Sequence, residues 1–512
     1  MGILDNVWLG LQTAASWTNL WYCFVGVFLG TLVGVLPGIG SLATIAMLLP
    51  FTFALEPTSA IIMLAGVYYG GAYGGSTTSI LLNVPGSASA AVACLDGYPM
   101  SRQGRAGVAL LGAACASWVG ATIGIIAVMF LSPPLSALAI KFGPTEYVAV
   151  MMLGLIAAAS LSGKSPMKGI AMILFGIIFG LMGTDVNSGV ARFAFGVPEL
   201  TDGIGIALMA MAVFGVSEMV DSVNKVKPGH FDPKSITFRS MVPTKDDMRR
   251  SWKPMLRGSF LGCIFGPLPG TGALVSCFSA YAVERALADD KSRFGKGAIE
   301  GVVAPEAANN ANDQTSFIPT MSLGIPDSAT MALLLGALMI HGISPGPQLI
   351  TDKPQLFWGL IMSFWIGNIM LVILNLPLIG IWIKLLAVPY HILYPMIMSL
   401  ICIGAYSISN NPFDVMVVAG LGVMGYLLRV LQMPAAPLLI GFVLGPLLEE
   451  YLRRAMLLSR GDFMTFIVNP ISGTMFAITG MLILWALYAT ILGRKKRLVE
   501  VEHLSVDAPK VS

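Results

Sequence analysis

Long apolar stretches separated by short polar segments run through almost all of this chain of 512 residues. A helix needs about 18 apolar residues to cross the ~30 Å hydrocarbon core of a bilayer, and several stretches meet or approach that length. The clearest of these stretches are residues 108–131, 169–182, 203–220 and 471–492. We therefore expect an all-α polytopic membrane protein with about 10–12 transmembrane helices, some of them broken or re-entrant.

Two glycine- and proline-containing motifs each occur twice. The segment Gly34-Val35-Leu36-Pro37-Gly38-Ile39-Gly40 recurs 232 residues later as Gly266-Pro267-Leu268-Pro269-Gly270-Thr271-Gly272. The segment Asn83-Val84-Pro85-Gly86-Ser87 recurs 241 residues later as Gly324-Ile325-Pro326-Asp327-Ser328. The order is kept, which indicates an internal duplication. Broken apolar segments at corresponding positions of two halves are typical of the substrate site of a secondary transporter.

The distribution of basic residues predicts that the two halves cross the membrane in opposite directions. Residues 221–257 contain nine Lys and Arg, so the positive-inside rule places this segment in the cytoplasm. The loop at residues 284–297 and the loop after Arg102 are also basic, whereas the links near Glu56 and Ser344 are not. We expect an inverted-topology pair of repeats. The expected divisions are a first repeat (1–220), a basic linker (221–257), a second repeat (258–493) and a cytoplasmic tail (494–512).

Composition limits the possible functions. The chain is 56% hydrophobic and 11% charged, against about 25% charged in soluble domains. Neither a nucleotide-binding loop nor a His-Glu-x-x-His motif occurs, and the six cysteines show no metal-ligand spacing. No cleavable signal sequence is recognisable at the amino terminus. We expect no metal or cofactor other than a coupling ion, and no nucleic-acid partner.

Polar residues inside the apolar stretches are the candidate site. In the first half, glycines and hydroxyl groups fill residues 68–79, which predicts a weak helix, and the turn Asn83–Ser87 follows with Gly86 free to adopt a positive φ. In the second half, Glu306 and neighbouring amides enter an apolar stretch, where a charge needs a cavity or a cation. The alternatives are close helix packing for the glycines and an extramembrane loop for Asn312-Asp313.

We expect one site between the halves. Its predicted substrate-binding residues are Pro37, Gly38, Gly40, Gly75, Ser76, Thr77, Asn83, Pro85, Gly86, Ser87, Gly270, Gly272, Asn310, Pro326, Asp327 and Ser328. Its predicted ion-coupling residues are Glu306, Asn309, Asn310 and Asp313, because carboxylate and amide oxygens are hard ligands suited to Na⁺ or H⁺.

These motifs, with the segments 96–100, 304–311 and 341–347, resemble the large membrane subunit of the tripartite tricarboxylate transporter family over residues 26–488. The resemblance implies a subunit of the bacterial inner membrane that takes up a carboxylate, such as citrate, with Na⁺ or H⁺. It also implies two partners, a small four-span membrane subunit and a periplasmic solute-binding protein. Resemblance to a wider group of ion-coupled carboxylate transporters further implies an elevator-like mechanism.

The chain departs from the family pattern at two places. After Asn310-Ala311 the family usually continues with small residues, where this chain has Asn312-Asp313-Gln314-Thr315. The family's Gly-Ile-Pro-Gly-Ser is here Gly-Ile-Pro-Asp327-Ser328. Both changes add acid or amide groups, which implies either a less anionic substrate than citrate or an extra cation.

Two other classes of function stay open at this point, an ion channel and a membrane-embedded enzyme. A channel normally builds a pore on an oligomer axis, whereas duplicated inverted motifs favour an enclosed site. An enzyme is disfavoured because no nucleophile–base or metal arrangement is visible, so we expect the chain not to be an enzyme.

Overall fold

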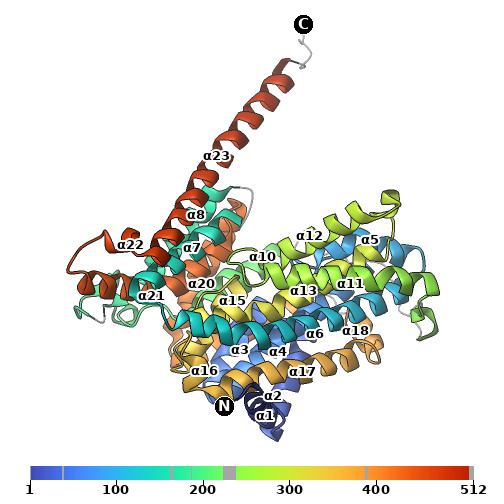
Figure 1. Ribbon diagram of the computed structural model, residues 1–512, viewed down its shortest axis with the longest axis horizontal. Helices are drawn as coiled ribbons and strands as arrows, with labels where there is room; N and C mark the ends of the chain where they lie inside the picture. The colour runs from blue at the N-terminus through green and yellow to red at the C-terminus, as the bar shows by residue number, and fades with distance from the viewer. Residues whose placement is uncertain are drawn as a thin grey trace.

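The computed structural model describes residues 2–36, 40–161, 165–185, 187–222, 238–386 and 390–506 (Figure 1). Helices dominate them, and the expected all-α polytopic class is confirmed. The helices up to the basic linker are α1 (Ile3–Ala14), α2 (Trp17–Val35), α3 (Gly40–Thr52), α4 (Pro57–Leu82), α5 (Ala91–Arg102), α6 (Ala106–Ala139), α7 (Pro144–Leu161), α8 (Pro166–Gly180), η1 (Pro198–Leu200), α9 (Ile206–Ala210), the π-helical η2 (Met211–Val216) and α10 (Ser217–Ser222).

Later helices begin inside the segment expected as a linker. They are η4 (Phe238–Met241), α11 (Lys245–Phe265), α12 (Gly272–Leu287), η5 (Lys291–Arg293), α13 (Glu300–Thr315), α14 (Phe317–Leu323), α15 (Ala329–Ile340), α16 (Leu349–Asp352), α17 (Pro354–Asn375), α18 (Ile379–Leu385), α19 (Tyr390–Ser409), α20 (Pro412–Val430), α21 (Ala435–Leu458), α22 (Thr465–Val468) and α23 (Pro470–Val506). The strands of the described residues are two short antiparallel ones, β1 (Gly183–Thr184) and β2 (Ala191–Arg192).

Seven helices in the described part of the chain are long and apolar enough to cross a membrane, which is fewer than the expected number. They are α2, α6, α17, α19, α20, α21 and the first half of α23, and α3, α7, α8 and α15 are apolar but shorter. The glycine-rich α4 and the polar α13 are buried along almost their whole length. Helices enclosed by protein in this way can carry polar residues that a lipid-facing span cannot.

Helix α4 runs unbroken through the glycine-rich stretch, where the sequence predicts a weak helix. Glu56 caps its amino end by accepting the Ser59 N–H at 3.2 Å, and Pro57 occupies the first turn. The helix ends only at Asn83, which is left-handed with φ 57°. Gly324, 241 residues later, ends α14 in the same way with φ 70°. The expected chain breaks therefore lie after the polar stretches, and Asn312-Asp313 is in a buried helix and not in a loop.

Glycines allow the neighbouring helices to pack closely against α4 and α13. A Cβ added to any of three glycines on α2, to two on α11 or to the glycine that follows α11 would lie only 2.2–2.8 Å from a carbonyl oxygen of α4 or α13. The pairs are Gly26 with Met63, Gly30 with Val67, Gly34 with Gly71, Gly258 with Ala304, Gly262 with Ala308, and Gly266 with Asn312. The glycines of the two sets are 232 residues apart and their partners 241 apart. These are the offsets of the two duplicated motifs.

Figure 1 shows how the helices group. Helices α2, α4, α5, α6, α11, α12, α13 and α17 lie together, whereas α7, α8, α20 and α21 form a second group, from which α23 projects. In the first group, α13 packs against α4, α5, α6, α11 and α12, and α6 also contacts α17. In the second group, α21 packs against α7 and α8. The central position of α4 and α13 brings the polar residues of both halves together.

Loops that the charge pattern predicts on one side of the membrane contact each other. The side-chain amide of Gln103 donates to the Lys296 carbonyl at 2.8 Å, which joins the end of α5 to the loop before α13. Elsewhere, His341 and Thr52 lie within hydrogen-bond distance at 3.3 Å, which joins the end of α15 to the end of α3. The predicted cytoplasmic loops therefore meet each other, and so do the predicted external ones.

Candidate functional site

Each duplicated turn closes against the other motif of its own half. The Gly270 N–H donates to the Asp327 carbonyl at 2.9 Å, so the second-half motifs touch through the backbone. In the first half, a Cβ on Gly86 would lie 2.5 Å from the Gly75 Cα and 2.6 Å from the Gly34 carbonyl oxygen. Gly86 is thus required for close approach, and not for the positive φ that we expected, which Asn83 takes instead. Pro37 and Gly38 lie outside the described residues.

Two predicted substrate-binding serines hold the start of the next helix. Ser87 Oγ accepts the Ala90 N–H, and Ser328 Oγ accepts the Met331 N–H, both at 3.3 Å. Such side chains satisfy helix N–H groups that have no partner within the helix. Gly40 and Gly272, which begin α3 and α12, have positive φ values of 67° and 54°. Glycine is favoured at both positions because of this backbone conformation.

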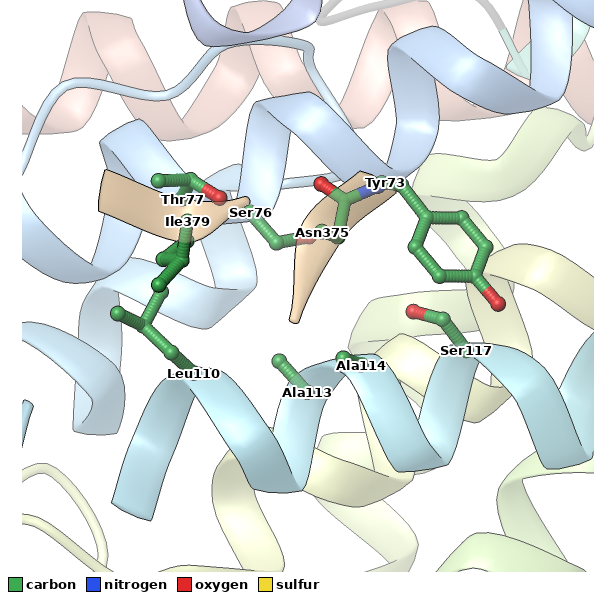
Figure 2. A pocket seen from close by; sticks show the side chains of 9 residues that line it. All are labelled: Tyr73, Ser76, Thr77, Leu110, Ala113, Ala114, Ser117, Asn375 and Ile379. Carbon is green, nitrogen blue, oxygen red and sulfur yellow. The ribbon is translucent and has the colours of Figure 1, made fainter. Parts of the chain in front are cut away.

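A small polar cavity lies between α4, α6 and the end of α17; we call it the serine cavity (Figure 2). Its volume is about 20 Å³, room for about one water molecule. It is lined by Tyr73, Ser76, Thr77, Leu110, Ala113, Ala114, Ser117, Asn375 and Ile379. Figure 2 shows Tyr73 and Ser117 extending from facing helices into the space between them, and the Tyr73 hydroxyl donates to Asn368 Oδ1 at 2.9 Å. Ser76 and Thr77 are therefore the two predicted site residues that line this cavity.

Glu306 reaches the serine cavity from α13. Ser117 Oγ donates to the Glu306 carboxylate at 3.4 Å, and Ser76, whose hydroxyl donates to the Ala72 carbonyl at 3.3 Å, lies close by. The side chain is buried, with 2% exposure. No basic side chain of the described residues forms an ion pair with it. A carboxylate placed in this way needs a proton or a cation.

A second polar cluster joins the two halves; we call it the acid cluster, and it consists of Tyr68, Asp313, Ser316 and Asp327. The Tyr68 hydroxyl on α4 donates to Asp313 Oδ1 at 2.8 Å. The Ser316 hydroxyl donates to Asp327 Oδ2 at 2.8 Å. Asp313 and Asp327 are close enough to interact electrostatically. The acid cluster is extended by Asn312, whose amide donates to Ser316 Oγ at 3.3 Å.

Several buried polar atoms of α13 and its surroundings have no partner among the described residues. Since burying an unpaired polar group is costly, such atoms point to water or a ligand. They include Asn309 Oδ1 and Nδ2, Asn310 Oδ1, Gln314 Oε1, Ser322 Oγ, Asp327 Oδ1 and Asn375 Oδ1. Within the described residues, no group of three or more His, Cys, Asp or Glu side chains could hold a metal ion. The unpaired carbonyl, carboxylate and hydroxyl oxygens of these residues are groups to which water or a ligand can bind.

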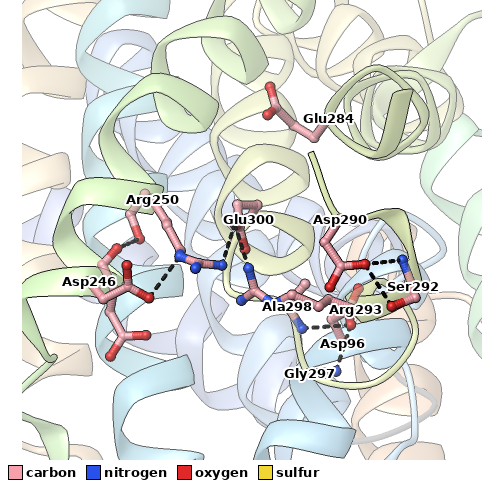
Figure 3. A network of polar contacts seen from close by, with 12 residues as sticks. Asp96, Asp246, Arg250, Glu284, Asp290, Ser292, Arg293, Gly297, Ala298 and Glu300 are labelled. Carbon is pink, nitrogen blue, oxygen red and sulfur yellow. Dashed lines mark hydrogen bonds and ion pairs between the residues drawn. The ribbon is translucent and has the colours of Figure 1, made fainter. Parts of the chain in front are cut away.

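Charged residues at the ends of α11 and α13 form an ion-pair network outside the buried region (Figure 3). Arg250 pairs with Asp246 at 2.7 Å and with Glu300 at 3.7 Å, and Arg293 pairs with Glu300 at 3.3 Å. In the adjoining loop, hydrogen bonds from Ser292 lower the pKa of the Asp290 carboxyl. This network links the two helices that carry the second-half motifs.

The structure thus brings the predicted residues together in two places. Ser76 and Thr77 line the serine cavity, whose Ser117 contacts Glu306, whereas Asp313 and Asp327 meet in the acid cluster. The sequence reasoning did not include Tyr68, Ser117, Ser316 and Asn375 among the site residues. Asn375 had a signal that could have found it, because it follows Asn368 by seven residues, which is two helical turns, in an apolar span.

Comparisons with known proteins give the family. The model of the tripartite tricarboxylate transporter TctA family matches residues 20–440. An Agrobacterium vitis protein described as an uncharacterized 52.8 kDa protein in the TAR-I ttuC' 3'region is 48% identical over 497 residues, which cover 97% of this chain and 99% of that protein. A second protein, described as an uncharacterized protein in the TAR-II ttuC' 3'region of the same organism, is 52% identical over 236 residues, 46% of this chain and 97% of its own length. No solved structure matches. The chain belongs to the tripartite tricarboxylate transporter TctA family, as its motifs indicated.

Proposed function

We propose that this chain is the large membrane subunit of a secondary active transporter that takes up a carboxylate across the bacterial inner membrane. Its partners in this proposal are a small four-span membrane subunit and a periplasmic solute-binding protein that delivers the substrate. Family membership supports the tripartite arrangement, and the substrate is of the tricarboxylate type. Na⁺ or H⁺ drives the uptake.

The observation that carries the proposal is the placement of Glu306 beside the serine cavity. The cavity is bordered by α4 and α6 of the first half and by the end of α17 in the second, and its Ser117 joins it to Glu306 of α13. Its volume of about 20 Å³ is far too small for a citrate-sized solute, so helices have to separate before the solute binds. Movement of one set of helices against the other around a buried site is how secondary transporters alternate access.

Matched packing in the two halves supports a pair of repeats, and the contacts of Gln103 with Lys296 and of Thr52 with His341 support their inversion. Helix α2 packs on α4 as α11 packs on α13, through glycines at constant offsets. The left-handed residues Asn83 and Gly324 end the corresponding helices. The two helix groups of Figure 1 are the natural units of an elevator-like movement, the group with α4 and α13 carrying the site past the group with α7, α8, α20 and α21.

An ion channel is the alternative from another class. A channel needs a continuous polar path, whereas the serine cavity is small and is bordered by the apolar side chains of Leu110 and Ile379. A membrane-embedded enzyme needs a nucleophile and a base in contact. Glu306, Asp313 and Asp327 accept from hydroxyl groups, and no histidine of the described residues pairs with them.

Reconstitution tests the proposal. Vesicles containing this chain and its small membrane subunit, supplied with the binding protein, should take up citrate or a related carboxylate saturably when a Na⁺ or pH gradient is imposed. Vesicles without this chain are the control. Carboxylate flux that rises linearly with concentration and needs no ion gradient would favour a channel and contradict the proposal.

A further inference from the structure

The acid cluster has more negative charge than its surroundings can balance. Asp313 and Asp327 are buried, with 3% and 1% exposure. The titratable groups that face Asp313 are Tyr68, Asp327 and Glu306, and the thiol of Cys277 on α12 is nearby. Asp327 faces Ser316 and Ser328, and Tyr68 interacts with it electrostatically. No Lys, Arg or His of the described residues pairs with either carboxyl group.

An independent observation points to a missing ligand. Asp327 Oδ2 accepts from Ser316, but Asp327 Oδ1 is buried and has no hydrogen-bond partner among the described residues. Two buried carboxylates without a positive partner are far too costly to be maintained, because each charge loses its hydration and repels the other. At least one proton or metal cation must therefore be bound to the acid cluster for the buried arrangement to be stable.

The duplication shows that the carboxyl groups of the acid cluster have no counterpart in the first half. Subtracting the offset of 241 residues from Asp313, Ser316 and Asp327 gives Ala72, Gly75 and Gly86. In the first half, Gly75 and Gly86 approach each other closely without side chains. The second half has a hydroxyl group and a carboxylate at these two positions, joined by a hydrogen bond. The first-half turn thus packs with glycine at both positions. Folding of the equivalent second-half turn therefore does not require the side chains of Ser316 and Asp327.

We infer that Asp313 and Asp327, together with the hydroxyl groups of Tyr68 and Ser316, form a binding site for one monovalent cation, a proton or Na⁺, that the first half lacks. This inference rests on the proposed function for its role in transport. Tyr68 lies on α4 of the first half and its hydrogen-bond acceptor on α13 of the second. Occupancy of the site therefore changes a contact that joins the halves, which is what coupling an ion to a movement requires.

Charge stoichiometry tests this site. We would compare the wild type with Asp313→Asn/Asp327→Asn in vesicles containing the complete three-component transporter. The reversal potential of carboxylate uptake gives the number of positive charges moved with each substrate. We expect the variant to move one fewer. The double variant Glu199→Gln/Asp202→Asn removes two exposed carboxyl groups instead and should keep the wild-type number.

A second variant removes the carboxyl groups in a way that should preserve folding. Asp313→Ala/Ser316→Gly/Asp327→Gly gives the second half the residues found at 72, 75 and 86, and the close contact of Gly75 with Gly86 shows that such a turn packs well. It should insert into the membrane and also move one fewer charge. An unchanged charge number in an inserted variant of either kind overturns the inference.

Infrared spectroscopy separates the two ions and does not depend on transport. If the site holds a proton, wild-type protein in choline salt shows a protonated carboxyl band that Asp313→Asn/Asp327→Asn lacks, and adding Na⁺ leaves this band in place. If the site holds Na⁺, the band disappears when Na⁺ replaces choline. A wild-type spectrum identical to that of the variant in both salts contradicts cation binding. Absence of wild-type uptake, with either band difference present, would contradict the proposed function and leave this site standing.

Discussion

At the scale of single residues, Glu306 is the side chain on which uptake should depend most. Glu306→Gln keeps the size of the side chain and an oxygen that can accept from Ser117, but it removes the charge. We expect normal insertion and an uptake rate at least about tenfold lower, which corresponds to about 1.4 kcal/mol of lost ion or substrate binding. Initial uptake rates at equal protein amounts measure this. Ser117→Ala, which leaves the carboxylate in place, should lose less, and wild-type rates in Glu306→Gln would exclude Glu306 from the site.

A second residue-scale prediction concerns stability. Asp96 of α5 accepts the N–H groups of Gly297 and Ala298 at 2.8 and 2.9 Å and the hydroxyl of Tyr281 at 2.9 Å (Figure 3 shows the backbone contacts). Asp96→Ala leaves these donors buried and unpaired, at a cost of about 3 kcal/mol or more. Thermal unfolding of the purified chain in detergent should show a clearly lowered midpoint. The exposed Asp289→Ala is the control, and equal midpoints for both variants would show that Asp96 does not hold the start of α13.

The turns show what a sequence can predict about single residues. The motif Asn83–Ser87 predicts a tight turn, and a turn is there. The left-handed residue is Asn83 and not Gly86, because Gly86 is selected by the nearness of Gly75 and Gly34. Those neighbours come from other parts of the chain, so no local pattern contains them. The partner of Asp313 could not be predicted from a local pattern either, since Tyr68 is 245 residues away from it in the sequence.

At the scale of helices, substitution of glycine by alanine should change stability by very different amounts at positions that look alike in the sequence. A Cβ at Gly30 would lie 2.5 Å from the Val67 carbonyl oxygen, and one at Gly262 would lie 2.4 Å from that of Ala308. We expect Gly30→Ala and Gly262→Ala each to cost about 1–3 kcal/mol by forcing two helices apart. Gly420→Ala meets nothing within 4 Å and should be neutral or stabilising by up to about 1 kcal/mol. Detergent unfolding midpoints test all three, and similar midpoints would contradict the packing.

Helix boundaries were predictable only in part. The long apolar stretch 108–131 is contained in α6, as expected, but residues 203–220 are divided among α9, η2 and α10. The polar residues of α13 suggested a break or a loop, yet the helix is continuous because α4, α6, α11 and α12 enclose it. Burial by neighbouring helices is a property of the whole fold. Hydropathy along the sequence therefore predicts the apolar spans but not the continuous, buried helices α4 and α13.

At the scale of the whole molecule, dependence on the binding protein follows from the proposed tripartite assembly. A membrane subunit that receives its solute from a partner has no need to bind it tightly alone. Uptake at low substrate concentration should therefore collapse by about tenfold or more when the binding protein is left out. Titrating the binding protein back should restore it. Full high-affinity uptake by this chain alone would contradict the assembly.

The arrangement of the two halves across the membrane gives the last prediction. Arg105 pairs with Asp247 at 2.5 Å, so the end of α5 lies beside the start of α11 in the basic segment, and the loop near Ala288 belongs to the same end of the molecule as the ion-pair network of Figure 3. Positive charge favours the cytoplasmic side for this end. The ends of α3 and α15, joined by Thr52 and His341, then face outward. With the six native cysteines replaced, Ala54→Cys and Ser344→Cys should react with an impermeant maleimide in intact cells, whereas Arg102→Cys and Ala288→Cys should react only after the membrane is opened. Labelling of positions 54 and 288 from the same side would rule out inverted repeats, because inversion requires the loops that follow the first motif in each half to lie on opposite sides of the bilayer.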